Sequence, residues 1–205
     1  MNSPKLALEN YYEAITHREY AKILECIDPA IQTEYDRTLY WMKRYENKAI
    51  ELQALIRKKF GPEICDRFIK KEYFSPFEEP LYGAGKSGYL DWTRIKEIPN
   101  LKLNIVELEV DGEPITLAVR KVNGKWYISI RGLEYKYWAE SLKHLRKMLK
   151  RLYNRDKSFI TAIQNGKINK ENIESVLLEG KECPGVPTGG KLEVKRERVP
   201  VCETK

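Results

Sequence analysis

The sequence predicts an α+β fold in which N-terminal helices pack on a strongly curved antiparallel sheet and a helical extension follows at the C-terminus. Apolar and polar residues alternate in three runs between positions 101 and 132, which is typical of strands that bury one face. Before and after this stretch, apolar residues recur at steps of three and four, which is typical of amphipathic helices.

Two short helices are predicted near the N-terminus. Ser3 and Pro4 combine an N-cap residue with a proline at the first helical position. Thr16 and Glu19 have the spacing of a capping box and are expected to start the second helix. Asp28, which precedes a proline, ends that helix and is expected to cap the next one.

A long amphipathic helix is predicted over 29–60, ended by Gly61 and Pro62. Its apolar residues are Ile31, Tyr35, Leu39, Met42, Tyr45, Ala49, Leu52 and Ile56. A further helical turn or two is expected at 63–69. The segment 71–92 is expected to be an ordered loop, because its aromatic residues offer much apolar area to bury.

A three-stranded antiparallel meander is predicted over 101–132. The apolar parity slips by one residue between Ile105 and Val106, which predicts a β-bulge and a sharp bend in the first strand. The Asp-Gly pair at 111–112 supplies one turn. The Asn-Gly pair at 123–124 is the strongest short signal for a hairpin.

Helices are predicted at 135–153, at 156–164 and from Asn169 to Leu178, followed by a tail that contains prolines and glycines and could add an edge strand. These elements divide the chain into an α+β domain at 1–134 with a helical insertion at 30–70, a basic helical extension at 135–182 and a tail at 183–205.

Positive charge gathers in the C-terminal third. The formal net charge is +7, and residues 135–205 hold 16 of the 37 Lys and Arg but only 9 of the 30 Asp and Glu. The helix predicted at 135–153 places basic residues opposite its leucines, so it can bind anionic lipid, a phosphate backbone or an acidic protein. The candidate anion-binding residues are Lys143, Arg146, Lys147, Lys150 and Arg151. Aromatic residues are not interleaved with them along the sequence, which disfavours nucleic acid.

No stretch reaches the roughly 18 apolar residues that a membrane-spanning helix needs, so we expect no transmembrane segment. The chain as written is expected to be cytoplasmic, or extracytoplasmic if a signal peptide was removed. Cys26 and Cys65 lie in helical patterns and are expected to be buried thiols. Cys183 and Cys202 would close a loop of about 20 residues as a disulfide in an oxidising compartment, or stay free thiols otherwise.

Two motifs resemble functional sites without meeting their requirements. The GAGKSG segment at 83–88 resembles a phosphate-binding loop, but Pro80 stands where a glycine is needed and no buried strand precedes it, so we interpret it as a flexible turn. His17 and His144 have no cysteine or second histidine at ligand spacing, so no metal site or catalytic triad is expected.

The segment ALENYYEAITHREYAKILECIDP at 7–29, followed by a bent sheet that ends in NGKWYIS, resembles the NTF2-like superfamily of cone-shaped α+β domains, also called SnoaL-like or cystatin-like. Enzymes of this superfamily use a pocket inside the cone, with an Asp or His base and tyrosine donors. The tyrosines available for such a pocket are Tyr12, Tyr40, Tyr45 and Tyr127. Glu107 and Glu109 have the parity that points outward, so no catalytic residue and no cofactor are assigned.

The sequence thus favours a non-catalytic binding or assembly module with a protein partner, or a homodimer formed through the sheet face opposite the apolar one. That face would hold Thr116, Ala118, Arg120, Lys125, Tyr127, Ser129 and Arg131. One alternative is an enzyme that acts on a small molecule in the cone pocket. The other is a binder of nucleic acid or an anionic membrane surface through the basic helix.

Overall fold

The computed structural model describes residues 3–72, 95–101, 105–110, 113–130 and 135–178. Most of the expected aromatic loop, the GAGKSG segment, the pair Cys183 and Cys202 and the tail lie outside these residues.

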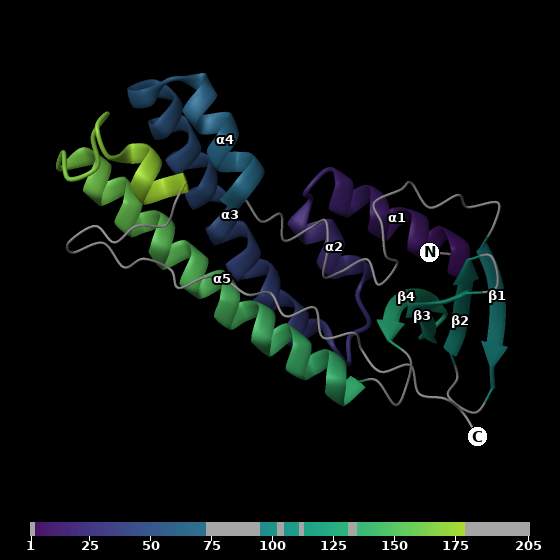
Figure 1. The fold of residues 1–205 in the computed structure, drawn as a ribbon. Coiled ribbons are helices and arrows are strands. Elements are labelled where there is room, and N and C mark those ends of the chain that lie inside the picture. Colours follow the sequence, from purple (N-terminus) through teal and green to yellow (C-terminus); the bar gives the residue numbers. More distant parts are fainter. Residues whose placement is uncertain (1–2, 73–94, 102–104, 111–112, 131–134, 179–205) are drawn as a thin grey trace.

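The described chain is an α+β structure, which confirms the predicted class (Figure 1). The helices are α1 (Pro4–Thr16), α2 (Tyr20–Cys26), α3 (Gln32–Phe60), α4 (Pro62–Glu72), α5 (Tyr135–Gln164) and the short π-helix η3 (Glu174–Leu178). The strands are β1 (Ile95–Asn100), β2 (Ile105–Val110), β3 (Glu113–Val122) and β4 (Lys125–Ile130), and they form one antiparallel sheet in the order β1-β2-β3-β4.

The elements are arranged in successive layers. Helices α1 and α2 pack on the sheet through β3 and β4, α3 packs next to α2, and α5 lies alongside α3 for most of its length. Helix α4 and η3 lie together at the far end of the α3–α5 pair. The long helices therefore extend beyond the part of the molecule that contains the sheet.

The N-terminal helices begin and end largely as predicted. Ser3 caps α1, because its Oγ accepts a hydrogen bond from the amide of Leu6 (3.1 Å). The expected capping box at Thr16 and Glu19 is wrong: Thr16 is the last residue of α1, and its hydroxyl donates to the carbonyl of Tyr12 instead (2.9 Å). Gly61 ends α3 with φ of +98°, a conformation that glycine adopts without strain.

The sheet differs from the predicted meander. It has a fourth strand, β1, which was not predicted, and its register shift lies between Glu107 and Glu109 rather than between Ile105 and Val106. The apolar parity slips at 105–106 because both faces of the sheet are covered there: Ile105 is buried and Val106 half-buried, on opposite faces. The expected strong curvature is not confirmed, since the described strands are not strongly curled.

The hairpin between β3 and β4 forms as predicted. Asn123 and Gly124 have φ of +49° and +82°, as the two-residue turn that matches strand twist requires. Val122 pairs with Lys125, Ala118 with Ser129 and Arg120 with Tyr127.

The C-terminal helices also differ from prediction. Helix α5 runs without a break over 30 residues, where two helices at 135–153 and 156–164 were expected. The segment after Asn169 forms turns and then η3, with Asn169 Oδ1 accepting from the amides of Glu171 and Asn172.

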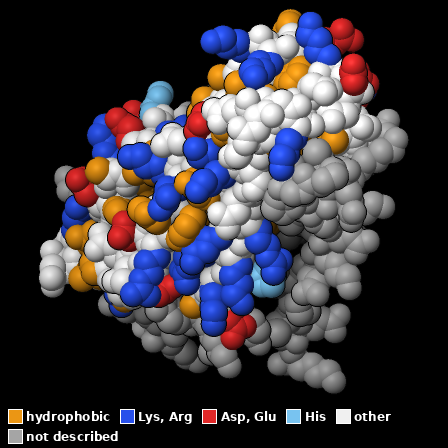
Figure 2. All heavy atoms as spheres, turned by 90° about the vertical axis from the view of Figure 1, so that its left-hand side faces the viewer, with side chains coloured by type: hydrophobic (Ala, Val, Ile, Leu, Met, Phe, Trp, Pro, Cys, Tyr) orange, Lys and Arg blue, Asp and Glu red, His pale blue; other side chains and the backbone are white. Residues whose placement is uncertain are grey.

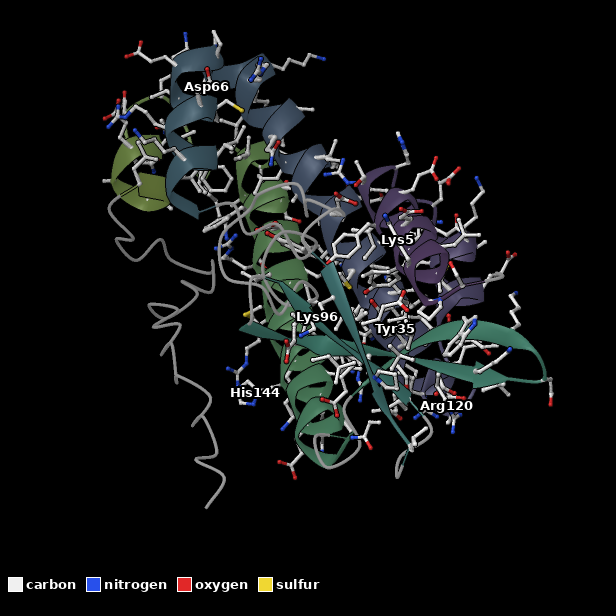
Figure 3. The ribbon with its side chains drawn as sticks, turned by 90° about the vertical axis from the view of Figure 1, so that its right-hand side faces the viewer. Lys5, Tyr35, Asp66, Lys96, Arg120 and His144 are labelled. Carbon is white, nitrogen blue, oxygen red and sulfur yellow. The ribbon has the colours of Figure 1, made fainter. Side chains whose placement is uncertain are left out.

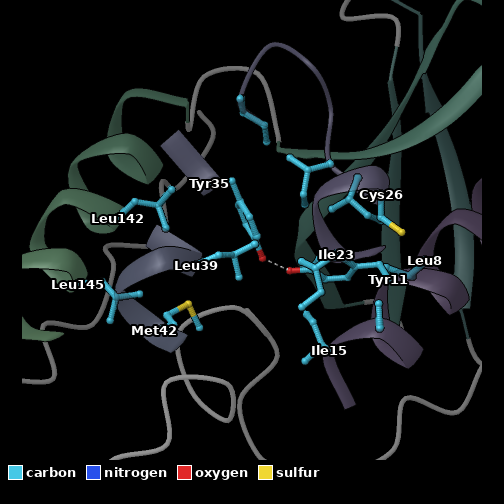
Figure 4. Close-up of a cluster of buried hydrophobic side chains, with 14 of the residues drawn as sticks. Leu8, Tyr11, Ile15, Ile23, Cys26, Tyr35, Leu39, Met42, Leu142 and Leu145 are labelled. Atoms are coloured by element: carbon cyan, nitrogen blue, oxygen red, sulfur yellow. Dashed lines mark hydrogen bonds between the residues drawn. The ribbon is translucent and has the colours of Figure 1, made fainter. Parts of the chain in front are cut away.

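Buried side chains form two apolar clusters. The first joins α1, α2, the first part of α3, the sheet and the first half of α5. Within it the hydroxyls of Tyr11 and Tyr35 hydrogen-bond to each other between α1 and α3 (Figure 4). The second joins the ends of α3 and α5 to α4 and η3. Helices α3 and α5 belong to both clusters.

Candidate basic–aromatic interface

The pairing of α3 with α5 brings aromatic and basic side chains together on one surface. Tyr40, Trp41, Arg44 and Lys48 lie on α3, and their neighbours on α5 lie more than 100 positions later in the chain. We define the basic–aromatic surface as Tyr40, Trp41, Arg44, Lys48, Lys150 and Tyr153.

Arg44 lies at the centre of this surface. Its guanidinium carbon is 5.4 Å from the ring centroid of Tyr40, 5.2 Å from Trp41 and 5.0 Å from Tyr153. These distances lie within the roughly 6 Å range of cation–π attraction. Its Nη1 also donates to the Tyr40 hydroxyl (2.6 Å), and its Nη2 donates to the Tyr153 hydroxyl (3.2 Å). An exposed arginine is thereby held in one orientation.

These contacts also stabilise the charged form of Arg44. Its hydrogen bonds to Tyr153 and Tyr40 raise the pKa of the Arg44 guanidinium. In return, the hydrogen bond from Arg44 lowers the pKa of the Tyr153 hydroxyl, and the charges of Arg44, Lys48 and Lys157 act in the same direction. The surface therefore carries a fixed positive charge among aromatic rings.

Other cations lie on the same rings. The Nζ of Lys150 is 4.9 Å from the Trp41 centroid, and the Nζ of Lys48 is 5.9 Å from the Tyr153 centroid. Lys48 pairs with Glu51. Among the described residues, Arg44 and Lys150 form no ion pair, so their charges are not neutralised by a described carboxylate.

Four of the five predicted anion-binding residues are exposed on α5: Lys143, Lys147, Lys150 and Arg151. The fifth, Arg146, fastens α5 to α3. Its Nη1 pairs with a carboxylate oxygen of Glu34 at 2.7 Å and donates to the Glu34 carbonyl and to Thr38 Oγ1. Aromatic residues are not interleaved with these basic residues along the sequence, but the fold places Trp41 of α3 against Lys150, with the Tyr153 ring packed on Trp41.

Figure 2 shows the face of the molecule at the left of Figure 1. Lys and Arg side chains gather across the middle of this face, and hydrophobic side chains lie between them. The sequence signal for the basic–aromatic surface was incomplete, since α5 alone shows basic residues and Tyr153, and only the pairing with α3 adds Tyr40, Trp41 and Arg44.

The four tyrosines predicted to line a pocket are not brought together. Tyr45 is fully buried, and Tyr12 is half-buried with its hydroxyl inside the structure. Tyr40 lies on the same helix as Tyr45, α3, but is 53% exposed. Tyr127 lies on β4 beneath Lys125. Two shallow hollows in the described chain are lined by other residues of α5 and of α1, α2 and β4.

Asp28 is a buried residue whose role the sequence did not reveal. Its carboxylate accepts from Arg120 Nη2 (2.5 Å), Ser129 Oγ (2.8 Å) and the amide of Ala30 (3.0 Å). Arg120 is labelled in Figure 3. The expectation that Asp28 caps the next helix is wrong, since Ile31 is the N-cap of α3 and makes no side-chain cap. Both carboxylate oxygens are engaged within the fold, so we assign Asp28 a structural role.

Glu46 is a second buried carboxylate, and it is also engaged within the fold. Arg18 Nε lies 2.8 Å from Glu46 Oε1, and the Tyr20 hydroxyl donates to Glu46 Oε2 (2.9 Å).

Within the described ranges, no group of three His, Cys, Asp or Glu residues could hold a metal ion. His17 and His144 are both exposed, the latter on α5 (Figure 3). Of the helices described, none has the length and apolar character needed to cross a membrane.

Comparison of the chain with protein-family models, with curated proteins and with solved structures found no match.

Proposed function

We propose that this protein is a non-catalytic binding module that binds nucleic acid through the basic–aromatic surface of α3 and α5. The observation that carries the proposal is Arg44, which three aromatic rings hold in place at the surface without a described carboxylate partner. Guanidinium groups held in this way are suited to phosphate, and the rings beside them are suited to bases.

Nucleic acid fits this surface better than an anionic membrane. A helix that lies on lipid inserts an apolar face below its basic residues. The apolar face of α5 is already used, because Leu145, Leu149 and Leu152 are buried in the first cluster against other elements. Among the described side chains of α5, those exposed to solvent are charged or polar, and the aromatic rings beside Lys150 are those of Trp41 on α3 and Tyr153.

The other functions considered have less support. A homodimer through the sheet face would need Ala118 and Ser129, but both are buried within one chain, and Ser129 donates to Asp28. An enzyme that uses a cone pocket would need a carboxylate free to react, and the buried Asp28 and Glu46 are both engaged in the fold. The NTF2-like superfamily remains our proposal for the fold family, supported by the packing of α1 and α2 on β3 and β4.

Binding of fluorescein-labelled 20-nucleotide DNA and RNA, followed by anisotropy at several salt concentrations, tests this proposal. We expect affinity to fall as salt rises, with a log–log slope of about −0.7 to −0.9 for each phosphate contacted. A variant that replaces Arg44 together with the exposed Lys147, Lys150 and Arg151 of α5 by Gln should bind on the order of tenfold to a hundredfold more weakly and show a shallower slope.

A matched control removes the same charge from exposed lysines on other elements. It replaces Lys5, Lys70, Lys96 and Lys170 by Gln. If the control loses as much affinity as the variant of Arg44, Lys147, Lys150 and Arg151, binding is due to net charge alone and the proposal is wrong. Binding to vesicles of anionic lipid in preference to either nucleic acid would also contradict it.

A further inference from the structure

We infer that the nucleic acid bound by the basic–aromatic surface is single-stranded, and that one of its bases stacks on the ring of Tyr40. This inference rests on the proposed function and names the form of the ligand. It is carried by the exposure and fixation of one aromatic side chain.

Tyr40 is 53% exposed, which is unusual for a large hydrophobic side chain in the described chain. Its ring is nevertheless held in place. The rings of Trp41 and Tyr40 pack edge to face, with centroids 5.6 Å apart and an interplanar angle of 89°. The Tyr40 hydroxyl also accepts a hydrogen bond from Arg44 Nη1 (2.6 Å). A ring that is already ordered loses little conformational entropy when a base stacks on it.

The two neighbouring rings are less accessible. Trp41 is half-buried, and its ring is approached by Arg44 at 5.2 Å and by Lys150 at 4.9 Å. Tyr153 is also half-buried and is approached by Arg44 at 5.0 Å. Arg44 also lies 5.4 Å from the Tyr40 centroid, so what distinguishes Tyr40 from the other two rings is its exposure. Its exposed part can take a base, and Arg44 beside it can neutralise a neighbouring phosphate.

A stacking platform of this kind selects for unpaired bases. In a duplex each base is stacked between its neighbours, so its face cannot lie on a protein ring unless the base is extruded. A single strand presents its bases freely, and aromatic stacking accepts any base because every base has a π-face. The ligand class implied is thus a single strand bound with little sequence preference.

The experiment compares four fluorescein-labelled 12-mers at one salt concentration: single-stranded oligothymidylate, single-stranded oligouridylate, a DNA duplex, and an abasic DNA strand with the same number of phosphates. We expect at least one base-containing single strand to bind about 5- to 100-fold more tightly than the abasic strand and the duplex. Tyr40→Ala should bind that strand no better than wild type binds the abasic strand. Tyr40→Phe should lose much less affinity than Tyr40→Ala, because it keeps the ring and its packing on Trp41 and loses only the hydroxyl that Arg44 holds.

The outcomes separate this inference from the proposed function. If all four ligands bind equally, or if Tyr40→Phe loses as much affinity as Tyr40→Ala, the stacking inference is wrong and phosphate binding stands. If none of the ligands binds, the proposed function fails as well. Because Tyr40 is exposed, both variants should unfold at the wild-type temperature, which circular dichroism verifies.

Discussion

Asp28 shows how one residue can connect three parts of the chain. It follows α2, accepts from the amide of Ala30 just before α3, and accepts from Arg120 and Ser129 on the sheet. Beside it, Ile27 forms a parallel bridge to Ile128 on β4. A buried carboxylate with these partners fixes the direction in which the chain leaves the sheet layer and enters the long helices.

Asp28→Ala should destabilise the protein, because it leaves the Arg120 guanidinium and the Ser129 hydroxyl without their acceptor. Breaking a buried ion pair costs about 3–5 kcal/mol. The Arg120 side chain is 34% exposed and can regain water, so we expect about 2–3 kcal/mol. Urea unfolding at pH 7 measures this loss.

The control for this measurement is Asp36→Ala, an exposed aspartate on α3. It should change the free energy of unfolding by no more than about 0.5 kcal/mol. An effect of Asp28→Ala as small as that of the control would show that the buried cluster adds nothing to stability.

At the scale of elements, Arg146 and Glu34 fasten α5 to α3. Burial alone would raise the pKa of the Glu34 carboxyl, but the hydrogen bond and charge of Arg146, together with Arg37, lower it. The ionised carboxylate is therefore favoured in the folded state. Its contribution to stability is present above the ordinary carboxyl pKa of about 4.5, and it is lost as the pH falls through the lower pKa of the folded state.

Glu34→Gln should consequently lower the free energy of unfolding by about 1 kcal/mol at pH 7, and by much less at pH 2.5. Urea midpoints at the two pH values measure the difference between wild type and variant. Asp36→Asn removes a charge from the same helix and should show no such dependence on pH. A deficit of Glu34→Gln that is equal at both pH values would mean that lost packing, rather than lost charge, is responsible.

Elements whose signals are local could be predicted from the sequence. The cap at Ser3, the stop at Gly61 and the turn at 123–124 each depend on a few adjacent residues, and all three form as expected. The predicted break in α5 is wrong. Arg155 and Asp156 interrupt the apolar stripe in the sequence, but this does not end the helix. The structure buries both side chains as an ion pair (2.9 Å), so the helix continues through them.

Features that depend on distant segments could not be predicted. The exposed side of α5 showed its lysines, but nothing in that segment indicates that Trp41 lies beside Lys150. The strand β1 was missed because its residues, IKEIPN, alternate weakly and include a proline. Asp28 was misinterpreted because an aspartate before a proline is typical of helix ends, and its partner Arg120 lies 92 positions away.

At the scale of the whole molecule, two helices connect the two apolar clusters. Helices α3 and α5 run through both, from Tyr35 and Leu142 in the first cluster to Ile56 and Ile163 in the second. An α-helix transmits order along its axis, because each hydrogen bond depends on the residues of the preceding turn. We therefore expect the two clusters to unfold as one cooperative unit.

Ile163→Ala tests this coupling, because Ile163 is buried in the second cluster, far from the sheet. The variant should lose about 2–5 kcal/mol. The urea midpoint should shift equally by circular dichroism, which reports on all helices, and by the fluorescence of the four tryptophans, of which Trp41 and Trp126 pack against the first cluster. Ile50→Ala, at an exposed position of α3, is the control. A shift in circular dichroism alone would show that the clusters unfold separately.

The contacts of residues 27 and 28 with β4 also have a consequence for how the chain folds. They join segments about 100 positions apart, since Asp28 and Ser129 are separated by 101. Closing so long a loop costs entropy before any contact compensates for it, and this slows folding. On the ribosome, α1 and α2 emerge well before β3 and β4, so their apolar faces must remain uncovered by the sheet until the Asn123–Gly124 hairpin has been synthesised.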